Sequence, residues 1–215
     1  MSPHPPASLS DLPGQVRLFP LGGAILLPRA VMPLNIFEPR YLAMVRDAMA
    51  TDQMIAIIQP RDSEARPALY DIGTTGRITQ YSESGDGRFL ISLTGLARFR
   101  LDNELSTTTP YRQAEVDYAP YSADWSPAEP LAPAARADLE TTLRSYLETQ
   151  GLSADWDAVK SADDESLTNT LATVCPFTNA ERQALLEADT LPDRASTLST
   201  LMQFARGDAS DRTLQ

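Results

Sequence analysis

Apolar and polar residues alternate over several short stretches in the first half of the chain. The clearest stretch is Arg88–Thr94, where Phe89, Ile91 and Leu93 fall on one side and the polar residues on the other. A period of two is typical of a β-strand with one buried face. Met54–Ile58 is apolar at every position, which predicts a strand covered on both faces. Further strands are expected at Gln15–Phe19, Val31–Phe37, Gly76–Tyr81, Ala97–Leu101 and Ala114–Tyr118, with a hairpin turn at Ser84–Gly87.

Helical periodicity begins once in the first half and dominates the second. Pro39 suits the first turn of a helix, and an apolar stripe follows it. In the second half, Gly151, Pro176 and Gly207 are expected to end helices, and Thr178 with Glu181 forms a capping box that opens one. The stripes consist of Tyr41, Leu42, Val45 and Met49, then Leu139, Leu143, Tyr146 and Leu147, then Leu167, Leu171 and Val174, then Leu198, Leu201, Met202 and Ala205.

These elements predict an α+β protein, with a small β-barrel in the first half and a helical bundle in the second. Four prolines between residues 119 and 133 mark the boundary. We expect a disordered lead-in at 1–14, a β-barrel subdomain with one helix at 15–119, a proline-rich linker at 120–133, a helical subdomain at 134–207 and a tail at 208–215.

The net charge of −11 argues against nucleic acid as a main partner, because 18 basic residues are scattered among 29 acids. Arg98 and Arg100, on one side of a predicted strand, are the best candidates for a local basic groove. No apolar run is long enough to span a membrane, and the first residues do not have the pattern of a secretory signal. A single cysteine fits the reducing cytoplasm, where we expect the protein to be.

The residue types that build hydrolytic sites are scarce. The only histidine is His4, in the predicted lead-in, so His-dependent nucleophilic catalysis and the usual zinc sites lack a base or ligand set. Cys175 lies at the end of an apolar stripe and is expected to pack. Lys160 and Ser161 stand side by side in an acidic stretch, which keeps the lysine protonated; we expect a surface charge and a helix cap.

Other motifs have structural explanations. Gly22 and Gly23 precede the apolar segment Ala24–Leu27, so a tight turn before a strand is expected rather than a phosphate-binding loop. The acids near Asp155 and Asp163 lack the spacing of a calcium loop and are expected to start helices. No nucleotide-binding Gly-x-x-x-x-Gly-Lys motif occurs, and we expect no metal and no cofactor.

The segment from Val31 to Tyr41 is more apolar than one strand face and one helix stripe need to bury. Alternation places Met32, Leu34 and Ile36 together, with Phe37 at the following turn. An exposed apolar patch on a protein usually marks an interaction site. The alternative is that all of these side chains are core. Glu38, with its neighbour Arg40, is expected to form an ion pair or a backbone contact that fixes the turn into the helix.

Several motifs resemble the N-terminal, substrate-binding domain of the Lon protease family. The order and spacing of these motifs hold from about Val16 to Phe204. The matching segments are Leu18–Leu21, Leu27–Pro28, Pro33–Tyr41, Ile72–Thr79, Gly87–Phe99 and Glu181–Glu187, followed by Arg194. The resemblance implies a barrel of the PUA-like type, and the protease and motor motifs of full-length Lon enzymes are missing.

The resemblance implies a stand-alone, non-catalytic protein that binds unfolded or hydrophobic polypeptide segments. Binding is expected in an apolar groove between the barrel and the helices. There an extended peptide would add to a strand edge and contact Met32, Leu34, Ile36, Phe37 and Tyr41. Such a protein would act as an adaptor or regulator in protein quality control, with a protease or chaperone as a further partner. Two alternatives remain open: an RNA-binding module on the PUA-like barrel, and an enzyme that uses carboxylates in a cleft.

Overall fold

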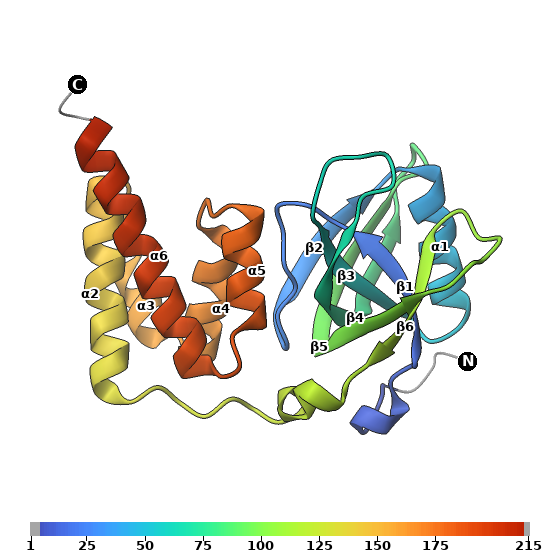
Figure 1. Cartoon of the computed structure of the whole chain (residues 1–215), viewed down its shortest axis with the longest axis horizontal. Coiled ribbons are helices and arrows are strands. Elements are labelled where there is room, and N and C mark those ends of the chain that lie inside the picture. The colour runs from blue at the N-terminus through green and yellow to red at the C-terminus, as the bar shows by residue number, and fades with distance from the viewer. Residues whose placement is uncertain (1–4, 213–215) are drawn as a thin grey trace. The chain divides into compact units, whose positions relative to one another are not determined.

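The computed structural model describes residues 5–212 and the side chains of residues 5–205. The chain forms two compact units, Met1–Pro127 and Ala128–Gln215. The first unit contains a six-stranded sheet with the strand order β2-β5-β4-β3-β1-β6 (Figure 1). Its strands are β1 (Gln15–Pro20), β2 (Val31–Ile36), β3 (Met54–Pro60), β4 (Leu69–Glu83), β5 (Phe89–Glu104) and β6 (Arg112–Asp117).

An additional antiparallel pairing joins β5 to β6, with Arg100 opposite Asp117 and Leu101 opposite Val116. Because β5 also pairs with β4, the strands β5, β4, β3, β1 and β6 form a closed ring of paired strands. Strand β2 stands outside this ring and pairs with β5. The expected α+β class is confirmed, while the sheet is more irregular than a simple barrel, with register shifts in three of its pairings.

The hairpin of β4 and β5 follows the predicted turn, with Glu83 opposite Phe89. The two strands predicted at Arg88–Thr94 and Ala97–Leu101 are one continuous strand that passes through Gly95. The glycine does not break the strand; it allows another segment to approach. A Cβ at Gly95 would lie 2.1 Å from the backbone oxygen of Leu27. Gly95 also accepts a hydrogen bond from the N–H of Arg29 and donates one to the oxygen of Ala30.

The segment Ala24–Leu27, expected to be a strand, has no regular secondary structure. Gly23, with φ of +76°, forms the predicted turn before it. Ile25, Leu26 and Leu27 are all fully buried. An apolar run of this length indicates burial, and here burial is achieved by an irregular segment rather than by strand pairing.

Helix α1 (Pro39–Ala50) begins at the predicted proline. Its buried side chains, Tyr41, Met44, Val45 and Ala48, join sheet residues in one hydrophobic cluster. A second cluster contains Leu18, Ala56 and Phe99 from the other faces of the strands. Strand β3 is buried from Met54 to Gln59, which confirms the interpretation of Met54–Ile58 as a strand covered on both faces.

Two segments expected to be unstructured are partly ordered. Before β1, a short 3-10 helix η1 (Leu9–Asp11) leads to Leu12, which is buried. The first part of the expected linker forms a second 3-10 helix, η2 (Ala119–Trp125), in which Asp124 is buried. Leu9 and Leu12 pack with the second hydrophobic cluster, and Asp124 accepts hydrogen bonds from Arg98 of β5. Sequence composition does not reveal such contacts.

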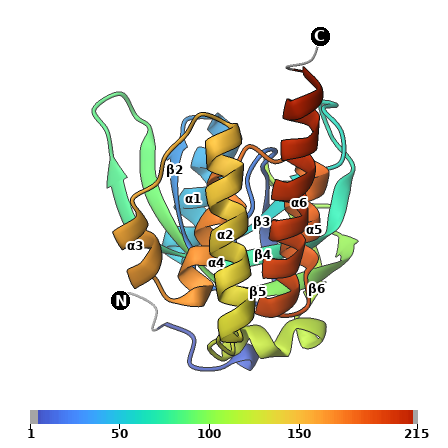
Figure 2. The ribbon, with the colours of Figure 1, turned by 90° about the vertical axis from the view of Figure 1, so that its left-hand side faces the viewer.

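The second unit is helical over its described residues. Helices α2 and α6 run side by side (Figures 1 and 2). Its elements are α2 (Pro133–Thr149), α3 (Trp156–Ser161), α4 (Asp164–Val174), α5 (Asn179–Glu187) and α6 (Leu191–Arg212). Leu139, Leu143, Leu171, Leu198 and Met202 are among its buried residues, as the stripes predict. None of the described helices is long and apolar enough to cross a membrane.

The ends of these helices test the expected caps. The capping box of Thr178 and Glu181 is confirmed, and Gly151 follows α2 with φ of +66°. Ser161 is not a cap, since Asp163 accepts the capping hydrogen bond of α4. Helix α6 continues through Gly207, because one glycine costs only about 1 kcal/mol in a helix. Val174 is exposed, and the neighbouring Cys175 is buried in its place.

Candidate polypeptide-binding surface

Burial divides the five residues predicted to contact a polypeptide. Phe37 is 61% exposed, whereas Ile36 is 2% and Tyr41 is 5% exposed. Met32 and Leu34 are half-buried and pack against the core cluster. The alternation of Met32, Leu34 and Ile36 is therefore the alternation of a core-facing strand. Of the five side chains, Phe37 alone is exposed rather than buried or half-buried.

Two rows of outward-facing residues on β2, β5 and β4 carry no charge and form a surface that is here called the outer face. Register places Asn35, Leu90 and Ser82 in one row across the three strands. The next row consists of Pro33, Ser92 and Gln80. These six residues line a shallow hollow of about 620 Å³, together with Leu34, Tyr81 and Ile91. Leu90, at its centre, is 49% exposed.

Strand β2 forms one end of the strand order, so its second edge has no paired strand among the described residues. Pro33 stands in the middle of this strand, as is typical of edge strands. Val31, also on β2, is exposed. An unpaired edge beside an uncharged face offers both backbone groups and side-chain contacts to an extended peptide.

Two exposed aromatic residues come from the same strands and the turn after β2. The guanidinium of Arg88 lies 5.7 Å from the centre of the Phe37 ring. The ring of Tyr81 lies 5.2 Å from that of Phe89, which is buried. Aromatic side chains in such positions provide large contact areas at low conformational cost.

The predicted ion pair of Glu38 and Arg40 is present, with 2.8 Å between the charged atoms. Both side chains are about half exposed, so the pair contributes at most about 1 kcal/mol. The backbone oxygen of Glu38 accepts hydrogen bonds from the N–H groups of Tyr41 and Leu42. Glu38 therefore fixes the start of α1 mainly through its backbone.

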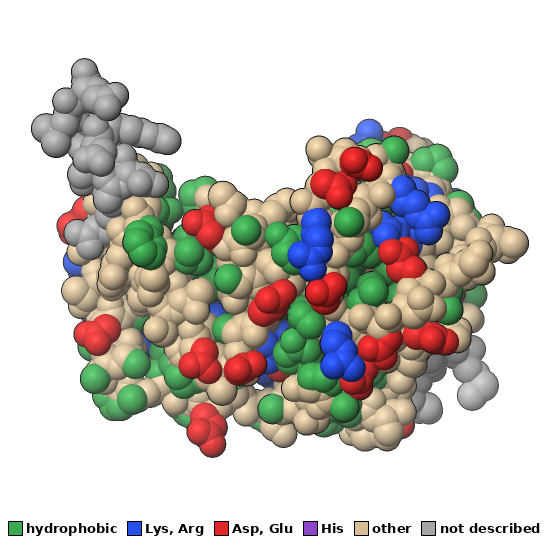
Figure 3. Space-filling view, in the orientation of Figure 1, with side chains coloured by type: hydrophobic (Ala, Val, Ile, Leu, Met, Phe, Trp, Pro, Cys, Tyr) green, Lys and Arg blue, Asp and Glu red, His purple; other side chains and the backbone are tan. Residues whose placement is uncertain are grey.

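The expected basic candidates do not form a groove. Arg98 is buried and donates to both carboxylate oxygens of Asp124. Arg100 pairs with Asp102 and Asp117. On the face shown in Figure 3, Lys and Arg side chains lie among Asp and Glu side chains rather than gathering together. These pairings remove the two residues that favoured nucleic acid binding.

Other residues singled out for possible chemistry have structural environments. Burial raises the pKa of the Cys175 thiol to about 11, which keeps it a protonated, packing side chain. The Ser161 hydroxyl donates to the oxygen of Ala158, and Lys160 lies in the last turn of α3. Among the described side chains, those of residues 5–205, no three His, Cys, Asp or Glu residues gather to hold a metal ion. His4 lies outside the described residues.

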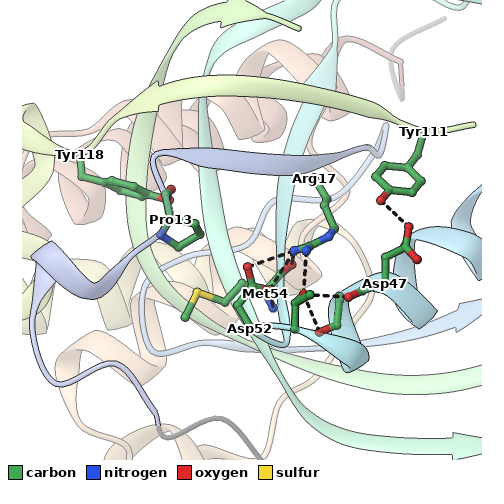
Figure 4. A network of polar contacts seen from close by, with 9 residues as sticks. Pro13, Arg17, Asp47, Asp52, Met54, Tyr111 and Tyr118 are labelled. Carbon is green, nitrogen blue, oxygen red and sulfur yellow. Dashed lines mark hydrogen bonds and ion pairs between the residues drawn. The ribbon is translucent and has the colours of Figure 1, made fainter. Parts of the chain in front are cut away.

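A polar network that the sequence did not suggest fixes the end of α1 (Figure 4). Arg17 of β1 pairs with Asp52 at 2.8 Å and donates to Thr51. The hydroxyl of Tyr111 donates to Asp47 at 2.6 Å. Burial, followed by this contact with Asp47, raises the pKa of Tyr111 to about 12. A phenol held protonated in this way is a permanent donor, and the network supports the fold.

Comparisons with known proteins agree on one domain type. A family model described as the ATP-dependent protease La (LON) substrate-binding domain matches residues 15–203. Lon protease 2 of Myxococcus xanthus is 33% identical over 121 residues, which are 54% of this chain and 14% of that protein. Lon protease 2 of Syntrophobacter fumaroxidans is 27% identical over 183 residues, which are 82% of this chain and 22% of that protein.

Solved structures show the same fold. The Lon N-terminal domain protein from Xanthomonas campestris aligns with a TM-score of 0.63 at 24% identity, covering 86% of this chain and 97% of that one. The N-terminal domain of the Mycobacterium avium complex Lon protease aligns with a TM-score of 0.62 at 20% identity, covering 88% and 98%. The matched region is the substrate-binding domain and does not include a catalytic domain.

Proposed function

The chain belongs to the family of Lon substrate-binding domains, and from this premise we propose that it binds unfolded polypeptide segments without acting on them chemically. The binding surface in this proposal is the outer face, extended by Phe37 and the free edge of β2. The bound segments are extended and rich in apolar residues. A protein of this kind serves as an adaptor or regulator, presenting the segment to a protease or chaperone.

The observation that supports this proposal best is the position of exposed apolar residues in the first unit. Val31, Phe37, Tyr81 and Leu90 all come from β2, β4, β5 or the residue after β2. The hollow that Tyr81 and Leu90 help to line has no charged lining residue. An uncharged sheet face of this kind is suited to apolar polypeptide segments.

Replacing Leu90 by Asp is expected to weaken peptide binding about tenfold or more, because a bound apolar side chain would then face a carboxylate. The probe is a fluorescein-labelled, unstructured peptide rich in Leu, Val and Phe, and binding is followed by fluorescence anisotropy. Leu90 is half-exposed, so the protein keeps its fold; circular dichroism verifies this for each variant.

Leu152→Asp is the matched control, because Leu152 is 59% exposed and belongs to the second unit. It is expected to bind the peptide as the wild type does. Equal binding by Leu90→Asp and the wild type would exclude the outer face, and an equal loss in both variants would show that the effect is one of net charge. Absence of binding by the wild type would reject the proposed function itself.

A further inference from the structure

The free edge of β2 presents a defined set of backbone groups. In an antiparallel pair, residues alternate between those whose N–H and C=O point to the partner strand and those whose groups point away. The N–H of Gly95 in β5 donates to the oxygen of Ala30, just before β2. The oxygen of Ser92, which lies opposite Pro33, instead accepts a hydrogen bond from the hydroxyl of Thr79 in β4. The residues of β2 that point to β5 are therefore Met32, Leu34 and Ile36, and those that point to the free edge are Val31, Pro33 and Asn35.

The outward-pointing groups are available to another strand. Val31, Pro33 and Asn35 are exposed, and within the described part of the chain their outward N–H and C=O groups have no hydrogen-bond partner. Three residues with two groups each would give six hydrogen bonds, and the missing N–H of Pro33 leaves five. The pairing of β2 with β5 loses nothing, because this missing donor falls on the free side.

The side chains of β2 add a preference for an alternating sequence. Met32 and Leu34 point to the core, yet each is only half-buried on this edge strand. A strand added to β2 places every second side chain beside Met32 and Leu34, because residues opposite each other share a face of the sheet. The intervening side chains lie beside Pro33 and Asn35, on the outer face. The edge therefore favours apolar residues at alternate positions and tolerates polar residues between them.

A second copy of the chain is a poorer occupant of this edge. When two antiparallel β2 strands align over all their outward residues, Pro33 of one copy lies opposite Pro33 of the other, and both central donors are missing. Two of the six hydrogen bonds are then lost, whereas a peptide without proline at the paired positions loses one. Pro33 thus acts against the association of two edges while it permits the addition of a peptide.

We propose that the segment bound at the edge of β2 is an amphipathic strand of an unfolded protein, at least five residues long and apolar at alternate positions. It forms hydrogen bonds with the outward backbone groups of β2. This assignment rests on the proposed polypeptide-binding function and adds the kind of segment and the contacts that hold it. Strands with one buried face carry this pattern, and unfolding exposes them.

Two labelled peptides of identical composition test the side-chain pattern. In the first, Val and Thr alternate over seven residues; in the second, the same residues form a Val block and a Thr block. Both carry Lys at each end for solubility. By fluorescence anisotropy with the full chain, the alternating peptide should bind about fivefold more tightly or better, because all its Val side chains lie on one face.

Backbone N-methylation of the alternating peptide tests the hydrogen bonds. The methyl group removes one donor, and it is introduced at each of the central residues in turn. Only every second N–H of an added strand points to β2. Methylation at these positions should weaken binding about fivefold, and at the intervening positions it should change the affinity less than about twofold. The set that responds gives the direction of the peptide relative to β2.

Substitutions in β2 test the same hydrogen bonds from the side of the protein. Val31→Pro removes one outward donor and should weaken binding about fivefold; proline is acceptable at the first residue of a strand. Val31→Ala is the matched control, because it shortens the side chain and keeps the N–H, and it should bind nearly as the wild type does. Pro33→Ala supplies the missing donor and should tighten binding about fivefold. Circular dichroism verifies the fold of each variant.

Equal affinity for the two peptides, equal effects of N-methylation at neighbouring residues, or equal affinity of Val31→Pro and Val31→Ala would each overturn the strand assignment. If both peptides bind equally and lose affinity in Leu90→Asp, the proposed function stands while this inference fails. Absence of binding by either peptide would reject both.

Discussion

Replacing Asp124 by Ala is expected to lower the free energy of unfolding of the first unit by about 3–5 kcal/mol. Asp124 is 6% exposed, and Arg98 is 3% exposed. One carboxylate oxygen accepts from both the backbone N–H and Nε of Arg98 at 2.9 Å, and the other accepts from Nη2 at 2.8 Å. Alanine removes these acceptors and leaves a buried guanidinium without its counter-charge. The guanidinium also lies 4.5 Å from the centre of the Tyr121 ring, so it cannot turn to water without disturbing η2.

Asp102→Ala is the comparison, because Asp102 pairs with Arg100 on the same strand at the surface. That pair is about half exposed, and its loss should cost no more than about 1 kcal/mol. Urea unfolding followed by tryptophan fluorescence measures the free energy of unfolding of both variants. In a Trp156→Phe background the remaining tryptophan, Trp125, reports on the first unit. A similar loss of unfolding free energy in the two variants would show that the buried pair stabilises the first unit no more than the surface pair does.

Gly95→Ala is expected to destabilise the first unit by about 3 kcal/mol or more, at the upper end of overpacking costs. The new Cβ would lie 2.1 Å from the oxygen of Leu27 and 2.9 Å from its carbonyl carbon. These are backbone atoms, so no side-chain rotation relieves the contact. The hydrogen bonds from Arg29 and to Ala30 would be strained as the segment moves away.

Gly85→Ala controls for the general effect of replacing glycine. A Cβ at Gly85 would have no neighbour within 4 Å, and its φ is not positive. The substitution should change stability by less than about 1 kcal/mol, because it mainly restricts the unfolded chain. The same urea unfolding applies to both variants. If Gly95→Ala were as stable as Gly85→Ala, the close approach to Leu27 would not exist.

The elements that depend on local pattern were predictable. Alternation in Arg88–Thr94 gives the buried and exposed faces of β5, and Pro39 gives the first residue of α1. The capping box of Thr178 and Glu181 is equally local. In each case, the information lies within a few residues, where periodicity and backbone chemistry act directly.

Features that depend on distant partners were not predictable. Asp124 falls in a proline-rich stretch that resembles a linker, and its contacts with Arg98 and Arg29 order it. Gly95 resembles a strand break, and only the approach of Leu27 explains it. Ala24–Leu27 has the composition of a strand but no strand to pair with. Tertiary context overrides local preference at these positions.

The candidate binding surface was also predictable only in part. The apolar segment from Val31 to Tyr41 points to the right part of the molecule, but periodicity alone does not say which of its side chains are sealed by α1 and β5. Ile36 and the ring of Tyr41 are core, whereas Phe37 is exposed. Leu90 stands among polar residues on the outward face of its strand, and such an apolar interruption of a polar face is a sequence signal of an exposed contact residue.

Site-directed cross-linking tests most directly whether the outer face receives polypeptides. Ser82→Cys, on that face, is labelled with a benzophenone maleimide; Cys175 is buried and does not compete for the label. Ser153→Cys, exposed in the second unit, is the matched control. On irradiation with the unstructured apolar peptide, the probe at position 82 should form a covalent adduct and the probe at position 153 should not. Adducts of equal yield at the two positions, or none at position 82 while the peptide is bound, would contradict the account.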